Sequence, residues 1–141
     1  ESSLRNNDIK LRQVTPEDKE MLLAWANDPV VRYQAINQHE ITIDEHSKWI
    51  NQHLNDPNTR MWILEYNGIP AGQLRWVLNG KEAILDYSIS HAFRGMGLGK
   101  VILKRGIDEV IKETLDKIGD NALYITFDLV SLDCGDSKFI V

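Results

Sequence analysis

Three glycines at alternate positions, Gly95, Gly97 and Gly99, are the most informative chemical feature of the sequence. They lie between an expected strand and an expected helix, where glycine lets the backbone approach a ligand closely. The first turn of a helix also presents N–H groups without intrahelical partners and a positive dipole. Arg94 and Lys100 flank the glycines, and no acidic residue lies between them. The segment therefore predicts a site for phosphate or pyrophosphate.

Two common phosphate-binding motifs do not fit this segment. A P-loop requires glycine where Arg94 stands and serine or threonine where Val101 stands. The dinucleotide motif G-x-G-x-x-G has a different spacing and belongs to a parallel strand-helix-strand unit. The alternative to a ligand site is that the glycines only shape a tight turn and allow close packing. The pattern alone leaves both interpretations open.

Alternation and helical spacing of apolar residues predict the elements around this turn. Asn-Gly pairs at 67–68 and 79–80 are strong hairpin signals, so we expect an antiparallel three-stranded meander. A capping box from Thr42 to Glu45 marks one helix start, and Thr15-Pro16 marks another. In chain order the expected elements are a strand over 9–14, a helix ended by 27–29, a helix ended by 55–58, strands over 61–66, 71–78 and 82–89, a helix from Leu98 to near Gly119, and a buried strand over 122–130.

Composition narrows the range of partners. The 141 residues are 43% hydrophobic and 26% charged, as in an ordinary single globular domain. A net charge of −5 would repel polyanions, so neither nucleic acid nor a membrane is an expected partner. Cys134 is the single cysteine, so the sequence predicts neither an intrachain disulfide nor a metal site. The same observation predicts a cytoplasmic location.

The run from Arg94 to Gly99 resembles the R/Q-x-x-G-x-G/A signature of the GNAT family of N-acetyltransferases, and the expected elements match that family over residues 9–130. The resemblance implies an α/β (α+β) fold, a mixed but mainly antiparallel sheet flanked by helices. It also implies acetyl-CoA as co-substrate and no metal. The cofactor-binding residues that it implies are Ser88, Ile89, Arg94, Gly95, Met96, Gly97, Leu98, Gly99 and Lys100.

Acetyl transfer to an amine requires a proton acceptor and a donor to the developing oxyanion. The resemblance implies a backbone N–H near Ile89 as that donor. For the proton acceptor the candidates are Asp86, Glu65 and His46, in that order. Asp86 interrupts an apolar strand beside the expected thioester site, where burial could raise its pKa. The alternative interpretations are a solvent-facing strand residue for Asp86 and a surface histidine for His46.

The acceptor side is predicted from W-x-N-D-P-x-V-R at 25–32 and H-x-x-W at 46–49. These motifs are similar to those of acetyltransferases acting on amino-sugar nucleotides in pseudaminic acid, flagellin or surface-polysaccharide synthesis, and also of ribosomal-protein N-terminal acetyltransferases. Asn27, Arg32, Asn37 and His46 are the candidate acceptor-binding residues, whereas Trp25 and Trp49 are expected to pack in the core. We therefore expect a small-molecule amine as partner.

The end of the chain departs from the family pattern. We divide the sequence into a polar lead-in at 1–8, an acetyltransferase-like domain at 9–130 and an atypical tail at 131–141. This tail is too short for the family's C-terminal helix and strands, and no tyrosine follows there to protonate the leaving thiolate. A truncated CoA-binding or interaction domain without catalysis is therefore a further hypothesis. Glu1 in place of Met predicts a piece of a longer polypeptide, so the partner could be another domain or a second copy.

Overall fold

A five-stranded sheet forms the centre of the protein, which we analysed as a computed structural model that describes residues 8–34, 38–79, 82–118 and 124–127. The strands lie in sequence order across the sheet, and each neighbouring pair is antiparallel except the parallel pair β4–β5. Their bounds are β1 Ile9–Gln13, β2 Thr59–Tyr66, β3 Ile69–Asn79, β4 Glu82–Ile89 and β5 Tyr124–Phe127. The predicted mixed, mainly antiparallel fold is confirmed.

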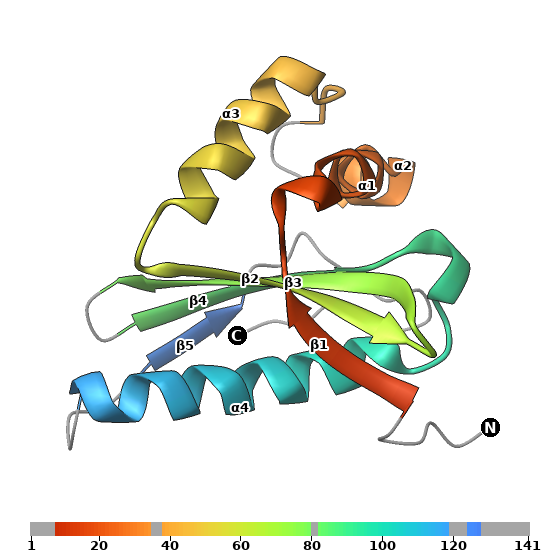
Figure 1. Ribbon diagram of the computed structural model, residues 1–141. Helices are drawn as coiled ribbons and strands as arrows, with labels where there is room; N and C mark the ends of the chain where they lie inside the picture. The colour runs from red at the N-terminus through yellow and green to blue at the C-terminus, as the bar shows by residue number, and fades with distance from the viewer. Residues whose placement is uncertain (1–7, 35–37, 80–81, 119–123, 128–141) are drawn as a thin grey trace.

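Helices cover both faces of the sheet (Figure 1). On one face lie α1 (Lys19–Ala26), α2 (Pro29–Gln34) and α3 (Ile43–Leu54), and on the other lies α4 (Leu98–Ile118). Two 3-10 turns, η2 (Pro16–Asp18) and η3 (His91–Phe93), precede α1 and α4. Helix α2 was not predicted from the sequence, although Pro29 is a favourable first helical residue. Among the described helices, none has the length and apolarity needed to cross a membrane.

Local sequence signals account for the element boundaries. The capping box of α3 is confirmed: the Thr42 hydroxyl accepts from the Glu45 N–H at 3.2 Å, and the Glu45 carboxylate accepts from the Thr42 N–H at 2.9 Å. The β2–β3 hairpin turns at Asn67 and Gly68, both with positive φ, as an Asn-Gly turn requires. The predicted tail at 131–141, and with it the expected lack of the family's C-terminal helix and strands, lies outside the described residues.

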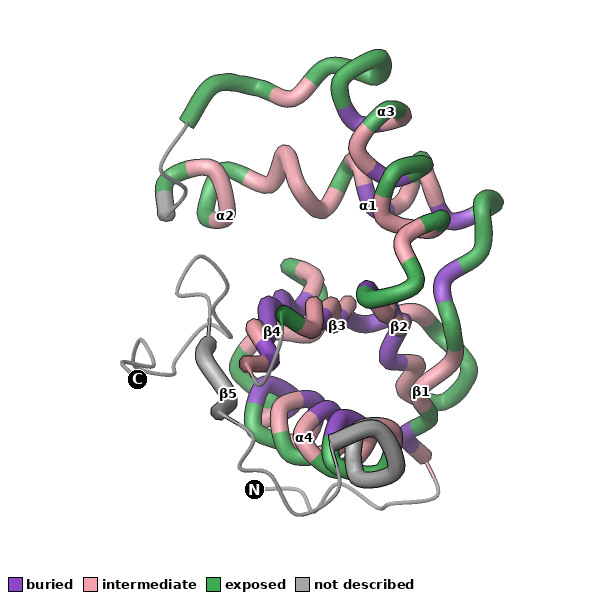
Figure 2. The backbone as a smooth tube through the Cα atoms, turned by 90° about the vertical axis from the view of Figure 1, so that its left-hand side faces the viewer, coloured by how far each residue is buried: buried purple, intermediate pink, exposed green. Residues whose placement is uncertain are grey.

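Two hydrophobic clusters fill the space on either side of the sheet. The larger joins residues of the sheet and α4, and the smaller joins residues of the sheet, α1 and α3. Figure 2 shows the buried positions along the strands, α4, α1 and α3. Trp25 and Trp49 pack against the smaller cluster, so their predicted core positions are confirmed. Because the sheet is pleated, alternate residues of β3 and β4 face opposite layers, and every second residue at the end of β4 belongs to the cluster beneath α4.

Helix α4 lies very close to β3 at Gly106. A Cβ placed on this glycine would collide with the Leu74 side chain, which is fully buried. Glycine costs free energy inside a helix, so its presence here reflects the close helix–sheet contact. That contact fixes how the first turn of α4 is placed relative to the sheet.

We expect Gly106→Val to lower the free energy of unfolding by about 1–3 kcal/mol, because the added methyl groups overpack the contact with Leu74. The matched control is Asp108→Val at an exposed position of the same helix, with an expected change within about 0.5 kcal/mol. Urea denaturation monitored by circular dichroism measures both. Equal stability of the two variants would show that the contact at Gly106 is not tight.

Candidate functional site

Strand β4 has different neighbours along its length. It pairs with β3 from Glu82 to Ile89, whereas in the described part of the chain β5 pairs only with Glu82–Leu85. The Ser90 N–H donates to the Ala71 carbonyl on the β3 side at 2.8 Å. Because N–H directions alternate along an antiparallel strand, the N–H of Ile89 points away from β3. The C-terminal half of β4 therefore has a backbone donor, the Ile89 N–H, on the edge that faces away from β3. The first half of β4 pairs with β5 along this same edge.

The two faces of β4 differ in chemistry. Leu85, Tyr87 and Ile89 belong to the core cluster beneath α4. Asp86 and Ser88 are buried on the opposite face, beside polar partners from β3. Gln73 Nε2 donates to Ser88 Oγ at 3.1 Å, and Arg75 Nη2 lies 2.9 Å from Asp86 Oδ2. This polar row adjoins the end of β4 on the face that carries α1–α3.

The glycine-rich turn lies directly between η3 and α4. Gly95 and Gly97 have φ values of 82° and 84°, a conformation that favours glycine. A Cβ on Gly97 would have no heavy atom within 4 Å, so open space adjoins this residue. Lys100 is exposed in the first helical turn, whereas the Leu98 side chain is fully buried. Positive φ explains why glycine stands at positions 95 and 97. Close packing does not explain the glycine at position 97, because the space around it is open.

Arg94 does not face the open side of this turn. Its side chain is 5% exposed, its Nε donates to the Ile89 carbonyl at 2.9 Å, and its Nη2 lies 3.1 Å from Asp28 Oδ2. Nη1 is buried without a hydrogen-bond partner. The charge of Arg94 is therefore paired with Asp28, although no acidic residue lies near Arg94 in the sequence of the glycine-rich turn.

The two carboxylates considered as proton acceptors are each bound by an arginine. Asp86 pairs with Arg75, whose guanidinium carbon lies 5.0 Å from the centre of the Trp49 ring. The alternative of a solvent-facing Asp86 is wrong, because the residue is 7% exposed. The pairing was readable from the hairpin: four residues outward from the pair Asn79–Glu82 on each strand are Arg75 and Asp86.

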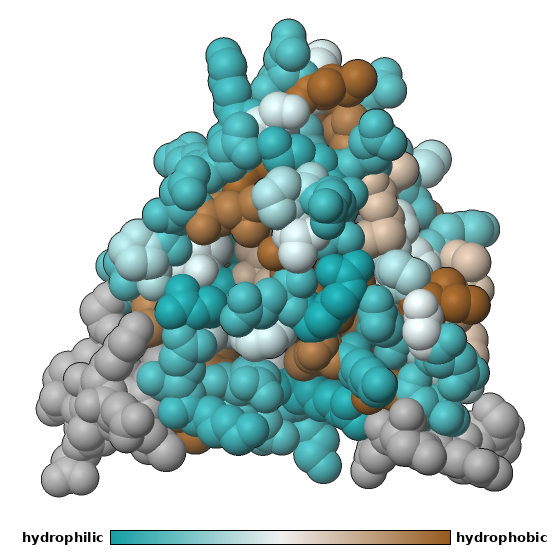
Figure 3. Space-filling model, in the orientation of Figure 1, coloured by the Kyte–Doolittle hydropathy of each residue, from teal (hydrophilic) through white to brown (hydrophobic). Residues whose placement is uncertain are grey.

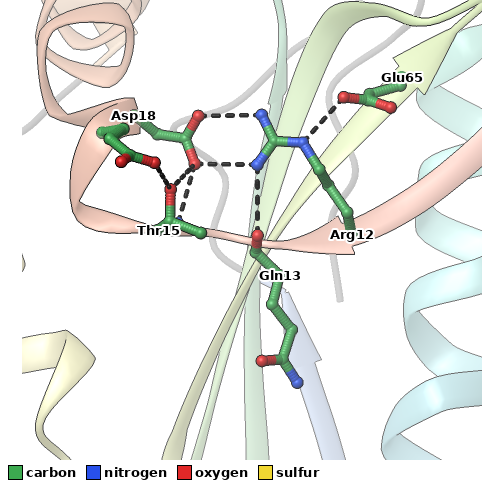
Figure 4. A network of polar contacts seen from close by, with 6 residues as sticks. Arg12, Gln13, Thr15, Asp18 and Glu65 are labelled. Carbon is green, nitrogen blue, oxygen red and sulfur yellow. Dashed lines mark hydrogen bonds and ion pairs between the residues drawn. The ribbon is translucent and has the colours of Figure 1, made fainter.

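Glu65 belongs to a separate network near the start of α1 (Figure 4). It accepts from Arg12 Nε at 2.8 Å, while the two terminal nitrogens of Arg12 each donate to Asp18 at 2.9 Å. The Asp18 carboxylate also accepts from the Thr15 N–H at 2.8 Å. Hydrogen bonding to Arg12 is the main cause of the lowered pKa of Asp18. Arg12 of β1 thus joins Glu65 of β2 to Asp18 of η2.

His46 is a buried residue of α3, so the alternative of a surface histidine is wrong. Its ring stacks on Trp49 with the centroids 5.8 Å apart. Burial, and to a smaller extent the charge of Lys19, lowers the pKa of His46 below its usual range. The imidazole is consequently neutral at physiological pH.

The other acceptor-side candidates hold the chain between α1 and α3. The Asn27 amide donates to the Ile41 carbonyl at 2.9 Å and accepts from the Ile41 N–H at 2.8 Å. Arg32 donates from Nε to the Ala26 carbonyl at 2.8 Å and from Nη1 to the His39 carbonyl at 3.3 Å. Both side chains therefore have structural partners, and Asn37 lies outside the described residues.

A cavity of about 430 Å³ lies elsewhere, between the end of β1, the end of α3 and the start of β2. Its lining is mostly polar and includes Gln13, His53, Asp56 and Arg60, none of which was a predicted site residue. Figure 3 shows a largely hydrophilic surface with small hydrophobic patches on the face drawn there. Within the described ranges, no group of three or more histidine, cysteine or acidic residues could hold a metal.

Comparison with solved structures identifies the same fold in bacterial enzymes. A spermidine N-acetyltransferase from Vibrio cholerae, solved with CoA and spermine, has a TM-score of 0.64 and 17% identity, over 73% of this chain and 63% of that one. An acetyltransferase from Thermus thermophilus has a TM-score of 0.62 and 25% identity, over 71% and 68%. An N-acetyltransferase from Staphylococcus aureus has a TM-score of 0.60 and 22% identity, over 74% and 67%.

The chain therefore spans less than two thirds of the Vibrio cholerae enzyme. A comparison with curated proteins finds no significant match. These findings do not support the amino-sugar nucleotide sub-family suggested by the motifs at 25–32 and 46–49. The sequence model of the acetyltransferase (GNAT) domain, however, matches residues 8–127. With its signature turn, its sheet and this match over most of its length, the chain belongs to the GNAT acetyltransferase family.

Proposed function

We propose that the protein transfers the acetyl group of acetyl-CoA to a primary amine. The observation that carries this proposal is the glycine-rich turn at residues 95–99, which follows the end of β4 and has open space beside Gly97. A structure of the same fold, the Vibrio cholerae enzyme, was solved with CoA. The turn fits a pyrophosphate held by backbone N–H groups. Glycine at position 97 leaves room for it, because any side chain there would enter the open space beside the turn.

In this proposal the turn and the end of β4 hold different parts of acetyl-CoA. Backbone groups from Gly95 to Lys100 and the exposed Lys100 ammonium stabilise the phosphates. The pantetheine arm lies along the end of β4 beside Ile89, whereas the same alternation turns the backbone of Ser88, the other predicted contact, towards Gln73 of β3. The Ile89 N–H, directed away from β3, donates to the thioester oxygen as negative charge develops there. The bond from the acetyl carbon to sulfur breaks as the amine nitrogen forms the new C–N bond. CoA leaves as a thiolate that takes up a proton from water.

For the proton of the attacking amine we propose Asp86. It is the carboxylate on β4 that lies nearest Ile89, about 10 Å away along the strand, so the proton passes through water. Arg75 holds this carboxylate in place. Glu65 lies on β2, which β3 separates from β4, and His46 is buried against Trp49 on α3, so neither is assigned a catalytic role.

The amine approaches from the face that carries α1–α3, because apolar residues close the α4 face of β4. Four carboxylates on this side have arginine partners: Asp18 and Glu65 with Arg12, Asp28 with Arg94, and Asp86 with Arg75. Their charges are therefore already paired and do not serve to bind a polycation. An amino-sugar nucleotide and a protein N-terminus are the two acceptor classes that the sequence motifs support. Cytoplasmic location and a partner copy or domain stay predictions.

Thiol release from acetyl-CoA tests the activity directly. The acceptors to compare are an amino-sugar nucleotide, a short peptide with a free N-terminus, and spermidine. The blank contains the protein and acetyl-CoA but no amine. Release that depends on one amine supports the proposal and identifies the acceptor class. CoA binding without release for any amine would favour the non-catalytic CoA-binding domain.

We expect Gly97→Glu to weaken CoA binding by about tenfold or more, because a carboxylate would enter the space proposed for the phosphates. The matched control is Gly68→Glu, since Gly68 also has positive φ and open space around its Cβ position but lies in the β2–β3 turn. Isothermal titration calorimetry gives both dissociation constants. An unchanged affinity in Gly97→Glu would refute the site.

We expect Asp86→Asn to lower kcat by about 100-fold or more, because the proton acceptor is lost. Arg75→Gln breaks the same ion pair but keeps the carboxylate, so it should retain a much larger share of kcat. The two variants are expected to be destabilised similarly and are assayed well below their melting temperatures. If both lowered kcat equally, Asp86 would have a structural role alone.

A further inference from the structure

The sequence Asn-Asp-Pro occurs twice, at 27–29 after α1 and at 55–57 after α3. The two turns have the same local hydrogen bonds. In each, the aspartate N–H donates to the carbonyl three residues earlier, and one aspartate oxygen accepts at 2.9 Å from the N–H two residues later. Asp28 and Asp56 therefore play the same local role, which is to accept a hydrogen bond from the backbone N–H two residues later.

The second carboxylate oxygen distinguishes the two turns. In Asp56 it accepts from the Thr59 hydroxyl at 2.9 Å, within the same turn. In Asp28 it lies 3.1 Å from Arg94 Nη2, on the residue that begins the glycine-rich signature. The Asp28 side chain is 13% exposed and the Arg94 side chain 5%. A turn that needs only a local cap has thus been joined to the proposed cofactor site.

Arg94 connects three segments that are far apart in the chain. Its backbone leads into Gly95, its Nε holds the last carbonyl of β4 at Ile89, and its Nη2 holds the start of α2 through Asp28. A buried ion pair contributes little net stability after desolvation but can select one geometry. The buried Nη1 has no protein partner, which leaves one donor for an oxygen of a ligand bound beside the turn.

We infer that Asp28 and Arg94 form a positioning pair that holds the α1–α2 junction, the end of β4 and the glycine-rich turn in one fixed arrangement. The contact itself is independent of the reaction, but its purpose rests on the proposed acetyl transfer. The pair keeps the acceptor-side helices and the cofactor turn in register across the end of the sheet. Asp28 acts through Arg94 and touches neither reactant.

Hydrogen–deuterium exchange of the full chain without CoA tests the contact. In Asp28→Asn and Arg94→Gln, the amides of residues 90–100 are expected to exchange about threefold faster or more, with β2 unchanged. The double variant should match Arg94→Gln, because both changes remove one interaction. Asp56→Asn, the matched control, should leave residues 90–100 as in the wild type. Arg94→Lys keeps the charge and should exchange more slowly than Arg94→Gln.

CoA affinity then tests the purpose. We expect Asp28→Asn to raise the CoA dissociation constant about threefold or more and Asp56→Asn to change it less than about twofold. Exchange at 90–100 that is the same in Asp28→Asn and Asp56→Asn would overturn the inference, as would equal exchange in Arg94→Lys and Arg94→Gln. If the wild type binds no CoA, the proposed function fails, whereas the exchange comparison still decides whether the pair positions the turn.

Discussion

The alternation of side chains along β4 is the constraint on which the rest of the site depends. Leu85, Tyr87 and Ile89 must face the apolar layer beneath α4, so Asp86 and Ser88 must face the other layer. The same strand changes neighbours halfway, because β5 pairs only with its first half in the described part of the chain. One strand thus supplies an apolar face that packs beneath α4, a polar face on the opposite side, and a backbone donor at its end.

Long-range contacts place the glycine-rich turn at that end. Gly106 lets α4 lie directly on β3, which fixes the helix whose first turn follows the glycines. Arg94 joins the turn to the last carbonyl of β4 and to Asp28 across the sheet. The position proposed for the phosphates therefore depends on contacts from three parts of the chain as well as on the glycines. A change far from the turn can consequently alter its geometry.

Features determined by short stretches of sequence were predictable. The Asn67-Gly68 turn, the capping box at Thr42 and the positive φ of Gly95 and Gly97 follow from local backbone preferences. Side-chain pairing between distant segments was not, because it depends on strand register and on how helices pack. The hairpin places Arg75 beside Asp86, whereas only the register of β1 against β2, which are far apart in the sequence, brings Arg12 near Glu65. Asn27 and Arg32 were chosen from the motif at 25–32, and no local pattern shows that their partners are backbone groups of Ile41, Ala26 and His39.

Backbone amide shifts in a nitrogen–proton NMR spectrum, recorded while CoA is added to the full chain, test the central claim most directly. The central claim is that the end of β4 and the turn beginning α4 form one cofactor site. The account predicts the largest shift changes at Ile89 and at residues 95–100. Largest changes instead around the cavity lined by Gln13, His53 and Asp56, with residues 95–100 unaffected, would contradict it.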